Sequence, residues 1–432
     1  MESKPDSVVS SHLTYIRRHS EQILTKVELD SQLSSIMNNV AAARLPETSE
    51  SKKNEATAER SFCRDTKPCE PIAVVGMAMR LPGGVRSEDQ FWEFLMNKQD
   101  AVSKVPETRS NVDSFYQQAK PNAIRTKKGY FLQEDPTEFD TGFFGITNYE
   151  ASRLDPQQRL LLEVVWECME NAGQVNWKGR DIGCWVGVFG EDWMDLCAKN
   201  IQYTDRLHAL GAGDYALANR ISYEYDLTGP RLETPEDRPF WLRLPMLTLR
   251  SMTVQTGCSS SLVGLHEACR AISTGDCSSA IVAGTSLILS PTMTTTMSEN
   301  MVLSPDGICK TFDAGADGYG RGEAINAVYL KPLKDAIAAG DRVRAVIRST
   351  ATNCDGRTVG ITTPGAPTQK QLIKRAYQKA GISEITDTAF FECHGSGTVV
   401  GDTAELSVVA DLFKDKGVYI GAVGVIILRV CL

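Results

Sequence analysis

The 432-residue sequence has no excess of basic residues, no long apolar run and no CxxC cysteine pair. Its formal net charge is −8, and because phosphate groups are bound by basic surfaces, nucleic acid is excluded as the main partner. The longest apolar run, residues 419–428, is shorter than the ~20 residues of a membrane-spanning helix. Residues 1–20 also lack the apolar core of a secretion signal. We therefore expect neither membrane insertion nor secretion.

Twelve cysteines are scattered along the chain without a regular spacing. In a chain of this length, that distribution predicts reduced thiols in the cytosol rather than a disulfide framework, and it indicates no metal site. Hydrophobic residues make up 42% of the sequence, which is enough for one large or two medium cores. These features are typical of an acidic enzyme of the cytoplasm.

The chain begins with a region that differs from the rest. An interrupted apolar stripe across residues 10–40 predicts one or two amphipathic helices in an N-terminal extension, residues 1–45. Such helices either pack on a partner or extend into solvent, and the stripe does not decide between the two. Residues 46–69 are polar and charged, as in a flexible linker. We expect the folded domain to span residues 70–432.

Strand and helix patterns alternate along this domain, which predicts an α/β fold with a parallel sheet that is buried on both faces. The clearest helix start has Asp155 as its cap and Pro156 at its first position. Glycines at 76, 83 and 84 follow the first strand, but they do not form the GxGxxG pattern of dinucleotide-binding folds, so we reject that class. The predicted strands are 71–76, 183–189, 252–256, 344–351, 388–393 and 418–428, and the predicted helices are 91–96, 156–170, 262–272, 368–380 and 402–413.

Cys258 lies where a predicted strand turns sharply into a helix. The first N–H groups of that helix favour a thiolate, which lowers the thiol pKa, and they are suited to bind an oxyanion. The small neighbours, Gly257 and the serines at 259–261, leave room for an acyl group beside the sulfur. The pattern is typical of a nucleophile, although a buried structural cysteine is the alternative interpretation.

Only five histidines occur in the sequence, and His394 has the most informative position. It follows a strand predicted to be buried, in the glycine-rich sequence FECHGSGT, where an open α/β sheet often carries a functional side chain. An imidazole there can stabilise an oxyanion or transfer a proton, or it can be a structural histidine bonded to backbone. His266 is expected to pack or hydrogen-bond within the core. A cysteine with a distant histidine also occurs in cysteine proteases, and the spacing does not separate the two classes.

Two regions do not fit the alternating pattern. Residues 231–250 contain three prolines and have neither a helix period nor a strand period, so we expect an anomalous insertion. After about residue 424 the sequence ends in an apolar strand without the elements that would cover its edge, so we expect a truncation.

Several motifs follow one another in a characteristic order along the chain. They are EPIAVVGM at 70–77, DPQQRLLLE at 155–163, QTGCSSSL at 255–262, FD at 312–313 with DGYGRGE at 317–323, and ECHGSGT at 392–398 with Gly401, Asp402 and Glu405. Together they resemble the β-ketoacyl synthase (ketosynthase) domain of type I polyketide synthases, most closely those of fungal reducing polyketide synthases. The resemblance covers residues from about 70 to 424, and the local signatures of cysteine proteases do not occur.

This resemblance implies a thiolase-like fold with a duplicated core in five α-β-α-β-α layers, whose C-terminal half is incomplete here, and a homodimer. It implies that Cys258 accepts an acyl chain from acyl carrier protein. A malonyl group on a second phosphopantetheine arm is then decarboxylated, and its enolate attacks the thioester to give a 3-oxoacyl product. His394 would stabilise the enolate, and Ser396 and Thr398 would contact the substrate. We expect no bound cofactor, since the carrier's phosphopantetheine holds the substrates, and we expect other polyketide synthase domains as partners.

The sequence departs from the family in two places. The second catalytic histidine, from a GHxEG segment, and the lysine of the GSVKxNxGH stretch before it have no counterpart. Joining residue 230 directly to residue 251 restores the family pattern, so we hypothesise that 231–250 is a translated intron. We expect acyl loading on Cys258 with loss of condensation; the alternative is a condensation-inactive fragment that acts only as a binding or scaffold protein.

Overall fold

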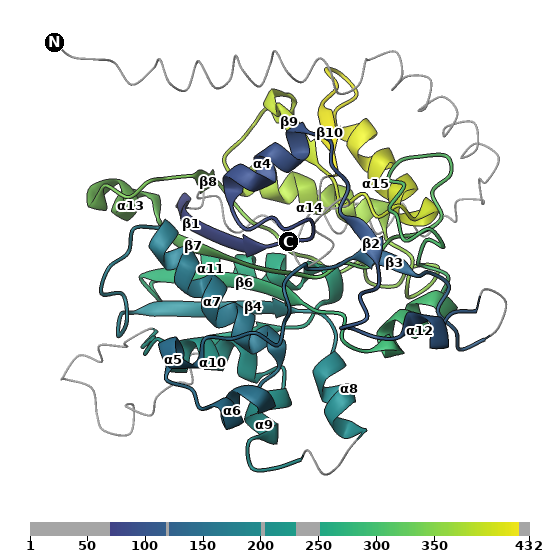
Figure 1. Ribbon diagram of the computed structural model, residues 1–432. Helices are drawn as coiled ribbons and strands as arrows, with labels where there is room; N and C mark the ends of the chain where they lie inside the picture. Colours follow the sequence, from purple (N-terminus) through teal and green to yellow (C-terminus); the bar gives the residue numbers. More distant parts are fainter. Residues whose placement is uncertain (1–69, 118–120, 200–203, 230–250, 423–432) are drawn as a thin grey trace. The chain divides into compact units, whose positions relative to one another are not determined.

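The computed structural model describes residues 70–117, 121–199, 204–229 and 251–422, in which helices and strands surround a six-stranded sheet (Figure 1). The helices predicted within residues 10–40, the predicted linker, the 231–250 insertion and the end of the strand predicted at 418–428 lie outside the described residues. None of the helices in the described ranges is long and apolar enough to cross a membrane.

The central sheet is mixed rather than parallel. Its strands, in spatial order, are β5 (Ser251–Val254), β4 (Ile182–Val188), β6 (Ser279–Ser286), β7 (Ala324–Pro332), β1 (Ile72–Arg80) and β8 (Ala345–Ile347). β4 runs parallel to β5 and β6, whereas β7 is antiparallel to both β6 and β1, and β8 is antiparallel to β1. The α/β class is confirmed, but the prediction of a parallel sheet is wrong for β7, β1 and β8. Alternation of strands and helices does not fix strand direction where a long irregular segment, as between β6 and β7, allows the chain to reverse.

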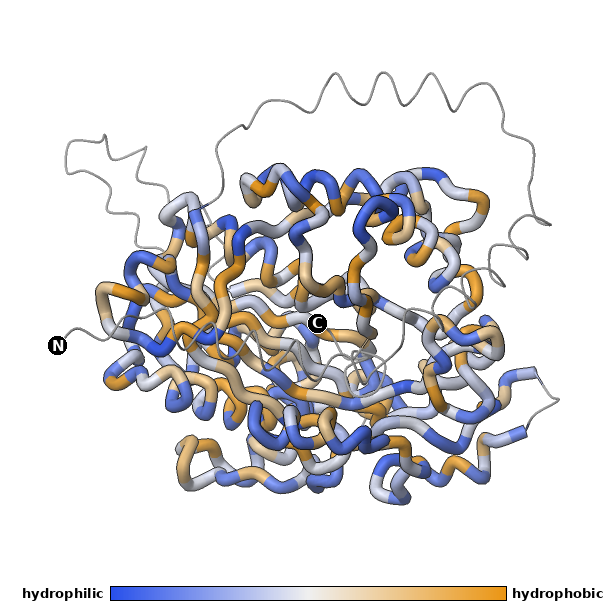
Figure 2. The backbone as a smooth tube through the Cα atoms, turned by 90° about the horizontal axis from the view of Figure 1, so that it is seen from above, coloured by the Kyte–Doolittle hydropathy of each residue, from blue (hydrophilic) through white to orange (hydrophobic). Residues whose placement is uncertain are grey.

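Helices cover both faces of this sheet. α7 (Pro156–Asn171) and α10 (Ala216–Glu224) lie on one face, and α11 (Ser260–Thr274) lies on the other. Alternate residues of β4 show the division, because Val186 packs in the cluster that contains α7, and Trp185 packs in the cluster that contains α11. Every residue of β4 and β6 is buried. In Figure 2 hydrophobic segments run through the interior of this layered part.

α7 begins as the sequence predicts. Asp155 is its cap and accepts a hydrogen bond from the backbone N–H of Gln157 at 2.8 Å, and Pro156 occupies the first turn. α7 also explains Gly76, since a Cβ added there would lie 2.5 Å from the carbonyl oxygen of Cys168. That glycine allows the close approach of helix and strand, which is a packing role.

The C-terminal part contains a second, smaller sheet. β9 (Phe390–Glu392) pairs in parallel with β10 (Tyr419–Gly421), and α14 (Ala366–Lys379) contacts α15 (Val399–Leu412). The prediction that the strand before His394 is buried is wrong, because Phe390 is 53% exposed and, of β9 and the residue after it, only Cys393 is buried. Among the described residues, nothing covers part of the surface of β9. The apolar composition of this segment therefore predicts more burial than the structure shows.

The remaining elements surround these layers (Figure 1). They are α4 (Glu88–Met96), β2 (Val102–Lys104), η1 (Val112–Ser114), β3 (Lys128–Tyr130), α5 (Thr141–Phe144), α6 (Asn148–Arg153), α8 (Asp192–Ala198), α9 (His208–Ala212), η4 (Gly257–Ser259), α12 (Pro291–Glu299), α13 (Leu333–Ala339) and η5 (Ile385–Asp387).

Candidate active site

Cys258 lies in η4, the short 3₁₀ turn between β5 and α11. The preceding residue, Gly257, has φ +66°, a left-handed conformation that a residue with a side chain adopts only with strain. The predicted turn from strand to helix is therefore confirmed. The side chain of Cys258 is exposed, so the alternative of a buried structural cysteine does not hold.

A buried serine fixes the shape of this turn. The hydroxyl of Ser260 donates to the carbonyl oxygens of Gly257 and Val188, at 2.6 and 3.1 Å, and accepts from the backbone N–H of Thr256 at 2.9 Å. At Gly187, a Cβ would lie 2.3 Å from the backbone nitrogen of Ser261, so only glycine lets the end of β4 approach the start of α11 this closely. The backbone that carries the thiol is thus held by a close-packed corner of the main sheet.

His394 is positioned in a different way, by a carboxylate. Glu405, in the second turn of α15, accepts hydrogen bonds from the backbone N–H groups of His394 and Gly395, at 2.7 and 2.8 Å. Burial raises the pKa of Glu405, and these two hydrogen bonds act in the opposite direction because they stabilise the charged form. One side chain therefore fixes the backbone on which the imidazole is mounted.

A second carboxylate holds the same loop one turn earlier. Buried Asp402 accepts from the backbone N–H of Gly397 at 2.9 Å and of Phe312 at 2.8 Å. The loop around residue 312 also reaches the histidine loop through the backbone N–H of Gly318, which donates to the carbonyl oxygen of Gly397 at 2.8 Å. A Cβ added at Gly397 would lie 2.8 Å from the carbonyl oxygen of Gly318, so the two loops approach closely at this glycine. The FD…DGYGRGE and HGSGT segments therefore form one hydrogen-bonded unit.

The structure brings the thiol and the imidazole together. Cys258 Sγ lies 3.7 Å from His394 Nε2, although the two residues are 136 positions apart in the sequence. This separation is within hydrogen-bonding distance for sulfur, and a proton can pass between the two groups in either direction.

Ser396 and Thr398, the predicted substrate contacts, lie in the loop after His394. Their hydroxyl oxygens are 2.6 Å apart, and the Thr398 hydroxyl accepts from the backbone N–H of Gly401 at 3.3 Å as the N-cap of α15. Both side chains are half-buried. Each hydroxyl thus has a structural contact within the loop, and contact with a substrate stays a prediction.

The other described histidines lie elsewhere. His266, on α11, is buried and its Nδ1 lies 2.7 Å from the hydroxyl oxygen of Thr350, so the expectation of a hydrogen bond within the core is confirmed. Burial lowers its pKa. His208 begins α9. His12 and His19 lie outside the described residues.

Several other thiols differ from Cys258 in their environment. Burial raises the pKa of Cys184, Cys277 and Cys393 to about 12, and it also raises that of Cys168. Cys354 is exposed, as is Cys258. Because the thiolate is the reactive form, most buried cysteines of the described part are poor nucleophiles, and Cys354 is the appropriate reference for Cys258.

Sequence reasoning left the positioning residues without a role. Asp402 and Glu405 match the family motif, and their i, i+3 spacing on a predicted helix after a glycine-rich loop indicates that both side chains can face that loop.

Nothing in the sequence around Arg109 indicates its structural role. It forms a buried ion pair with Glu323, 2.8 Å between Nε and Oε1, and Glu323 also accepts from the backbone N–H groups of Leu132 and Ile288. This pair anchors the end of the DGYGRGE segment.

Two domain families match the chain. The β-ketoacyl synthase N-terminal domain matches residues 69–234 and 247–336, and the β-ketoacyl synthase C-terminal domain matches residues 344–426. The chain belongs to the β-ketoacyl synthase family, whose members are acyltransferases. The resemblance inferred from the ordered motifs is confirmed.

Similar curated proteins are fungal highly reducing polyketide synthases. The synthase g433 of Fusarium sp is 53% identical over 355 residues, and gloL of Glarea lozoyensis is 50% identical over 358 residues; each match covers 82% of this chain and 13% of the relative. The chain thus spans about 13% of the length of these multidomain relatives.

Solved structures of ketosynthases share the fold. The oxazolomycin ketosynthase domain OzmH KS7 of Streptomyces albus JA3453 superposes with a TM-score of 0.72 at 33% identity, covering 84% of this chain and 60% of that chain. The ketosynthase from module 6 of the bacillaene synthase of Bacillus subtilis 168 gives 0.69 at 32% identity, covering 83% and 58%. The expected thiolase-like α/β class is confirmed.

Proposed function

We propose that this chain is a ketosynthase domain of a polyketide synthase, in which Cys258 takes an acyl chain from acyl carrier protein. The observation that supports this most directly is the 3.7 Å separation of Cys258 Sγ and His394 Nε2, at the motif positions of a β-ketoacyl synthase. The substrates arrive as thioesters on phosphopantetheine, so the domain itself needs no cofactor.

In the first step, the thiolate of Cys258 attacks the carbonyl carbon of the acyl thioester. A new C–S bond forms, the tetrahedral oxyanion collapses, and the carrier's phosphopantetheine leaves as a thiolate that takes up a proton. His394 Nε2, 3.7 Å from the sulfur, accepts the thiol proton as the thiolate forms, and the start of α11 supplies positive potential beside the sulfur and the oxyanion. The loop at 394–398 carries the hydroxyls of Ser396 and Thr398, which we propose contact the incoming arm.

In the second step, malonyl thioester loses CO₂ and becomes an enolate, whose carbon attacks the acyl group on Cys258. The new C–C bond yields the 3-oxoacyl thioester, and the Cys258 thiolate is released. His394 donates a hydrogen bond from Nε2 to the enolate oxygen as negative charge develops there, which lowers the barrier. In the family, a second histidine and a lysine assist; the 432-residue sequence has no histidine after His394.

We also propose that the domain works as a homodimer with the other domains of a polyketide synthase, in the cytoplasm. β5 supports the dimer, since it is at the edge of the six-stranded sheet and directly precedes Cys258. A second copy can pair with this edge and thereby cover its backbone groups.

The test is acyl loading of the 432-residue chain. The chain is incubated with hexanoyl carrier protein, and its intact mass is followed with time. We expect one hexanoyl group per chain, removable by hydroxylamine, and none on the Cys258→Ala variant. Equal loading of Cys258→Ala would contradict the proposal.

A malonyl arm of the same experiment separates the two steps. Losing one group that stabilises developing charge costs about 10²–10³ in rate. No histidine follows His394 within the 432 residues, so a polypeptide of these residues alone should load hexanoate but form 3-oxooctanoyl product well below the rate of a complete ketosynthase. Product formation comparable to that of a complete ketosynthase would contradict this expectation.

We further infer that residues 231–250 are an insertion foreign to the domain. The N-terminal family match resumes at residue 247 after leaving 235–246 unmatched, which supports this. Messenger RNA from the source organism tests the idea: we expect transcripts that join codon 230 to codon 251, and an insert present in every transcript would overturn it.

A further inference from the structure

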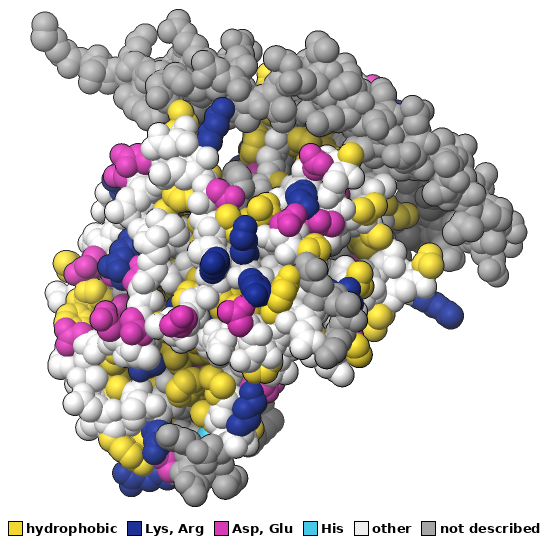
Figure 3. Space-filling view, turned by 45° about the vertical axis from the view of Figure 1, so that its right-hand side comes forward, with side chains coloured by type: hydrophobic (Ala, Val, Ile, Leu, Met, Phe, Trp, Pro, Cys, Tyr) yellow, Lys and Arg dark blue, Asp and Glu magenta, His cyan; other side chains and the backbone are white. Residues whose placement is uncertain are grey.

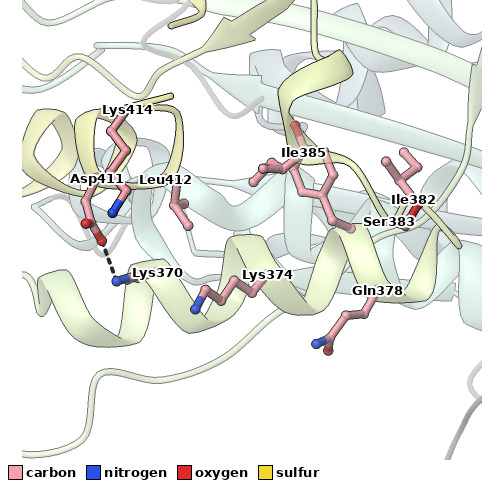
Figure 4. Close-up of a pocket in the computed structure, with 10 residues that line it drawn as sticks. Lys370, Lys374, Gln378, Ile382, Ser383, Ile385, Asp411, Leu412 and Lys414 are labelled. Atoms are coloured by element: carbon pink, nitrogen blue, oxygen red, sulfur yellow. Dashed lines mark ion pairs between the residues drawn. The ribbon is translucent and has the colours of Figure 1, made fainter. Parts of the chain in front are cut away.

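A surface hollow of about 400 Å³ lies between α14 and the end of α15 (Figure 4). It contains none of the residues assigned to the Cys258–His394 site. The lining residues are Lys370, Lys374, Tyr377, Gln378, Ile382, Ser383, Ile385, Asp411, Leu412 and Lys414.

The floor of the hollow is apolar and firmly supported. Tyr377, Ile385 and Leu412 are half-buried and pack against a core cluster formed by Cys393, Val409 and Phe413. Their other sides contribute to the hollow. The floor therefore offers hydrophobic contact area without needing a change in the fold beneath it.

Lysines gather at one end of the hollow, and isoleucines lie at the other (Figure 4). Lys370 pairs with Asp411, and this ion pair lowers the pKa of the aspartate; the charges of Lys414 and Lys374 add to the effect. Lys374 and Lys414 are exposed, and neither forms an ion pair with another described residue. Three lysines and one aspartate thus give the lining of the hollow a net positive charge beside an apolar floor.

This face of the molecule combines both kinds of side chain. On the face shown in Figure 3, basic side chains lie next to hydrophobic ones, with acidic side chains among them. The chain as a whole has a net charge of −8. A locally positive, partly apolar surface on an acidic protein favours a partner with the opposite charge and its own apolar side chains.

We propose that this groove docks an acidic amphipathic helix from a partner protein. Leucine-type side chains of the helix occupy the floor at Ile385 and Leu412, and its carboxylates pair with Lys374 and Lys414. Nucleic acid fits poorly, because the chain has a net charge of −8 and a phosphate backbone would leave the apolar floor uncovered. A small anion would leave the apolar floor uncovered. Amphipathic helices in apolar grooves are a common mode of protein recognition.

The test uses a fluorescein-labelled helical peptide whose adjoining faces carry Glu and Leu, with the full 432-residue chain and fluorescence anisotropy. Two control peptides keep the same length: one has Lys in place of every Glu, and the other has Ser in place of every Leu. We expect saturable binding of the Glu/Leu peptide, weakening as salt is raised, and no saturable binding of either control.

Matched variants of the chain then locate the site. Lys374→Glu with Lys414→Glu should weaken binding by about tenfold, because two attractive pairs become repulsive. Lys416→Glu reverses one charge two residues from Lys414 but outside the hollow, and it should bind as the unchanged chain does. Equal weakening by Lys416→Glu, binding of the Lys/Leu peptide, or no binding of the Glu/Leu peptide would each overturn the proposal. Cys258→Ala should leave peptide binding unchanged, which separates this test from that of the acyl-transfer function.

Discussion

The two regions that meet at the site are built differently. The region around the main sheet buries every residue of β4 and β6, with α7 and α11 on opposite faces. In the C-terminal region, α14 has no buried residue, and the residues of β9 and β10 are half-buried or exposed. Cys258 belongs to the first region and His394 to the second.

The difference shows two ways to place a reactive group. The turn at Cys258 is fixed by packing, since Gly187 leaves room for a close backbone contact and Gly257 adopts a left-handed φ. The loop of His394 depends on the carboxylates of Asp402 and Glu405, which bind its backbone N–H groups. We therefore expect the thiol position to follow global stability, and the imidazole position to follow a few hydrogen bonds.

The largest expected effect compares one substitution in both regions. Leu161, on α7, is fully buried, and Leu161→Ala should lower the free energy of unfolding by about 3 kcal/mol, because it leaves a cavity. Leu412→Ala, in the half-buried cluster of the C-terminal region, should cost about 1 kcal/mol. Urea denaturation followed by circular dichroism measures both values. Equal losses would break the comparison.

The next effect concerns the positioning of His394. Glu405→Ala removes the acceptor of two backbone N–H groups, and the rate of Cys258 acylation should fall about tenfold, since a displacement of ~1 Å can cost up to ~10² in rate. Glu405→Gln retains one acceptor oxygen and should fall less. Glu384→Ala, an exposed acid outside the loop, is the control. An unchanged rate and pH profile in Glu405→Ala would show that packing holds the histidine.

Substitutions at two helix caps compare the same two regions with a smaller loss of stability. Asp155 caps α7 and Thr398 caps α15, and replacing either by Ala should cost about 1 kcal/mol. In hydrogen–deuterium exchange, Thr398→Ala should speed exchange mainly within 390–421, whereas Asp155→Ala should act on the main sheet as a whole. Uniform exchange changes in both variants would mean that the two regions unfold as one unit.

The smallest effect is a pH dependence near the nucleophile strand. Burial, together with Asp155 and Glu191, raises the pKa of Asp214 from 3.8 to about 7, and Gln255, three residues before Cys258, donates a hydrogen bond to it. The folded state then holds this proton more tightly than the unfolded state, so the group's contribution to stability is lost as pH rises from about 4 to about 7.

Asp214→Asn removes this dependence. Its melting temperature relative to the unchanged chain should therefore rise between pH 5 and pH 8, as differential scanning fluorimetry can measure. Asp415→Asn, at an exposed position, should show no such trend. A difference for Asp214→Asn that is constant with pH would contradict the assignment.

Sequence features that act within a few residues predicted several elements of this structure correctly. Asp155 with Pro156 predicted the start of α7, and the change of period after Cys258 predicted the turn into α11, because caps and periodicity act within a few residues. Neither β6 nor β7 is among the predicted elements. The expectation of a parallel sheet is wrong at β7, because strand pairing depends on contacts between residues that are distant in sequence. The pairing of Cys258 with His394 likewise came from the family resemblance, because a spacing of 136 residues contains no geometric information.

The central claim is that Cys258 is an activated thiol beside His394. Competitive labelling with isotope-coded iodoacetamide, read by peptide mass spectrometry across the twelve cysteines, tests it most directly. The account predicts that Cys258 reacts about tenfold faster than Cys354, the exposed reference thiol, and that His394→Ala removes much of this difference. Equal labelling of Cys258 and Cys354, or a rate at Cys258 that His394→Ala leaves unchanged, would contradict the account.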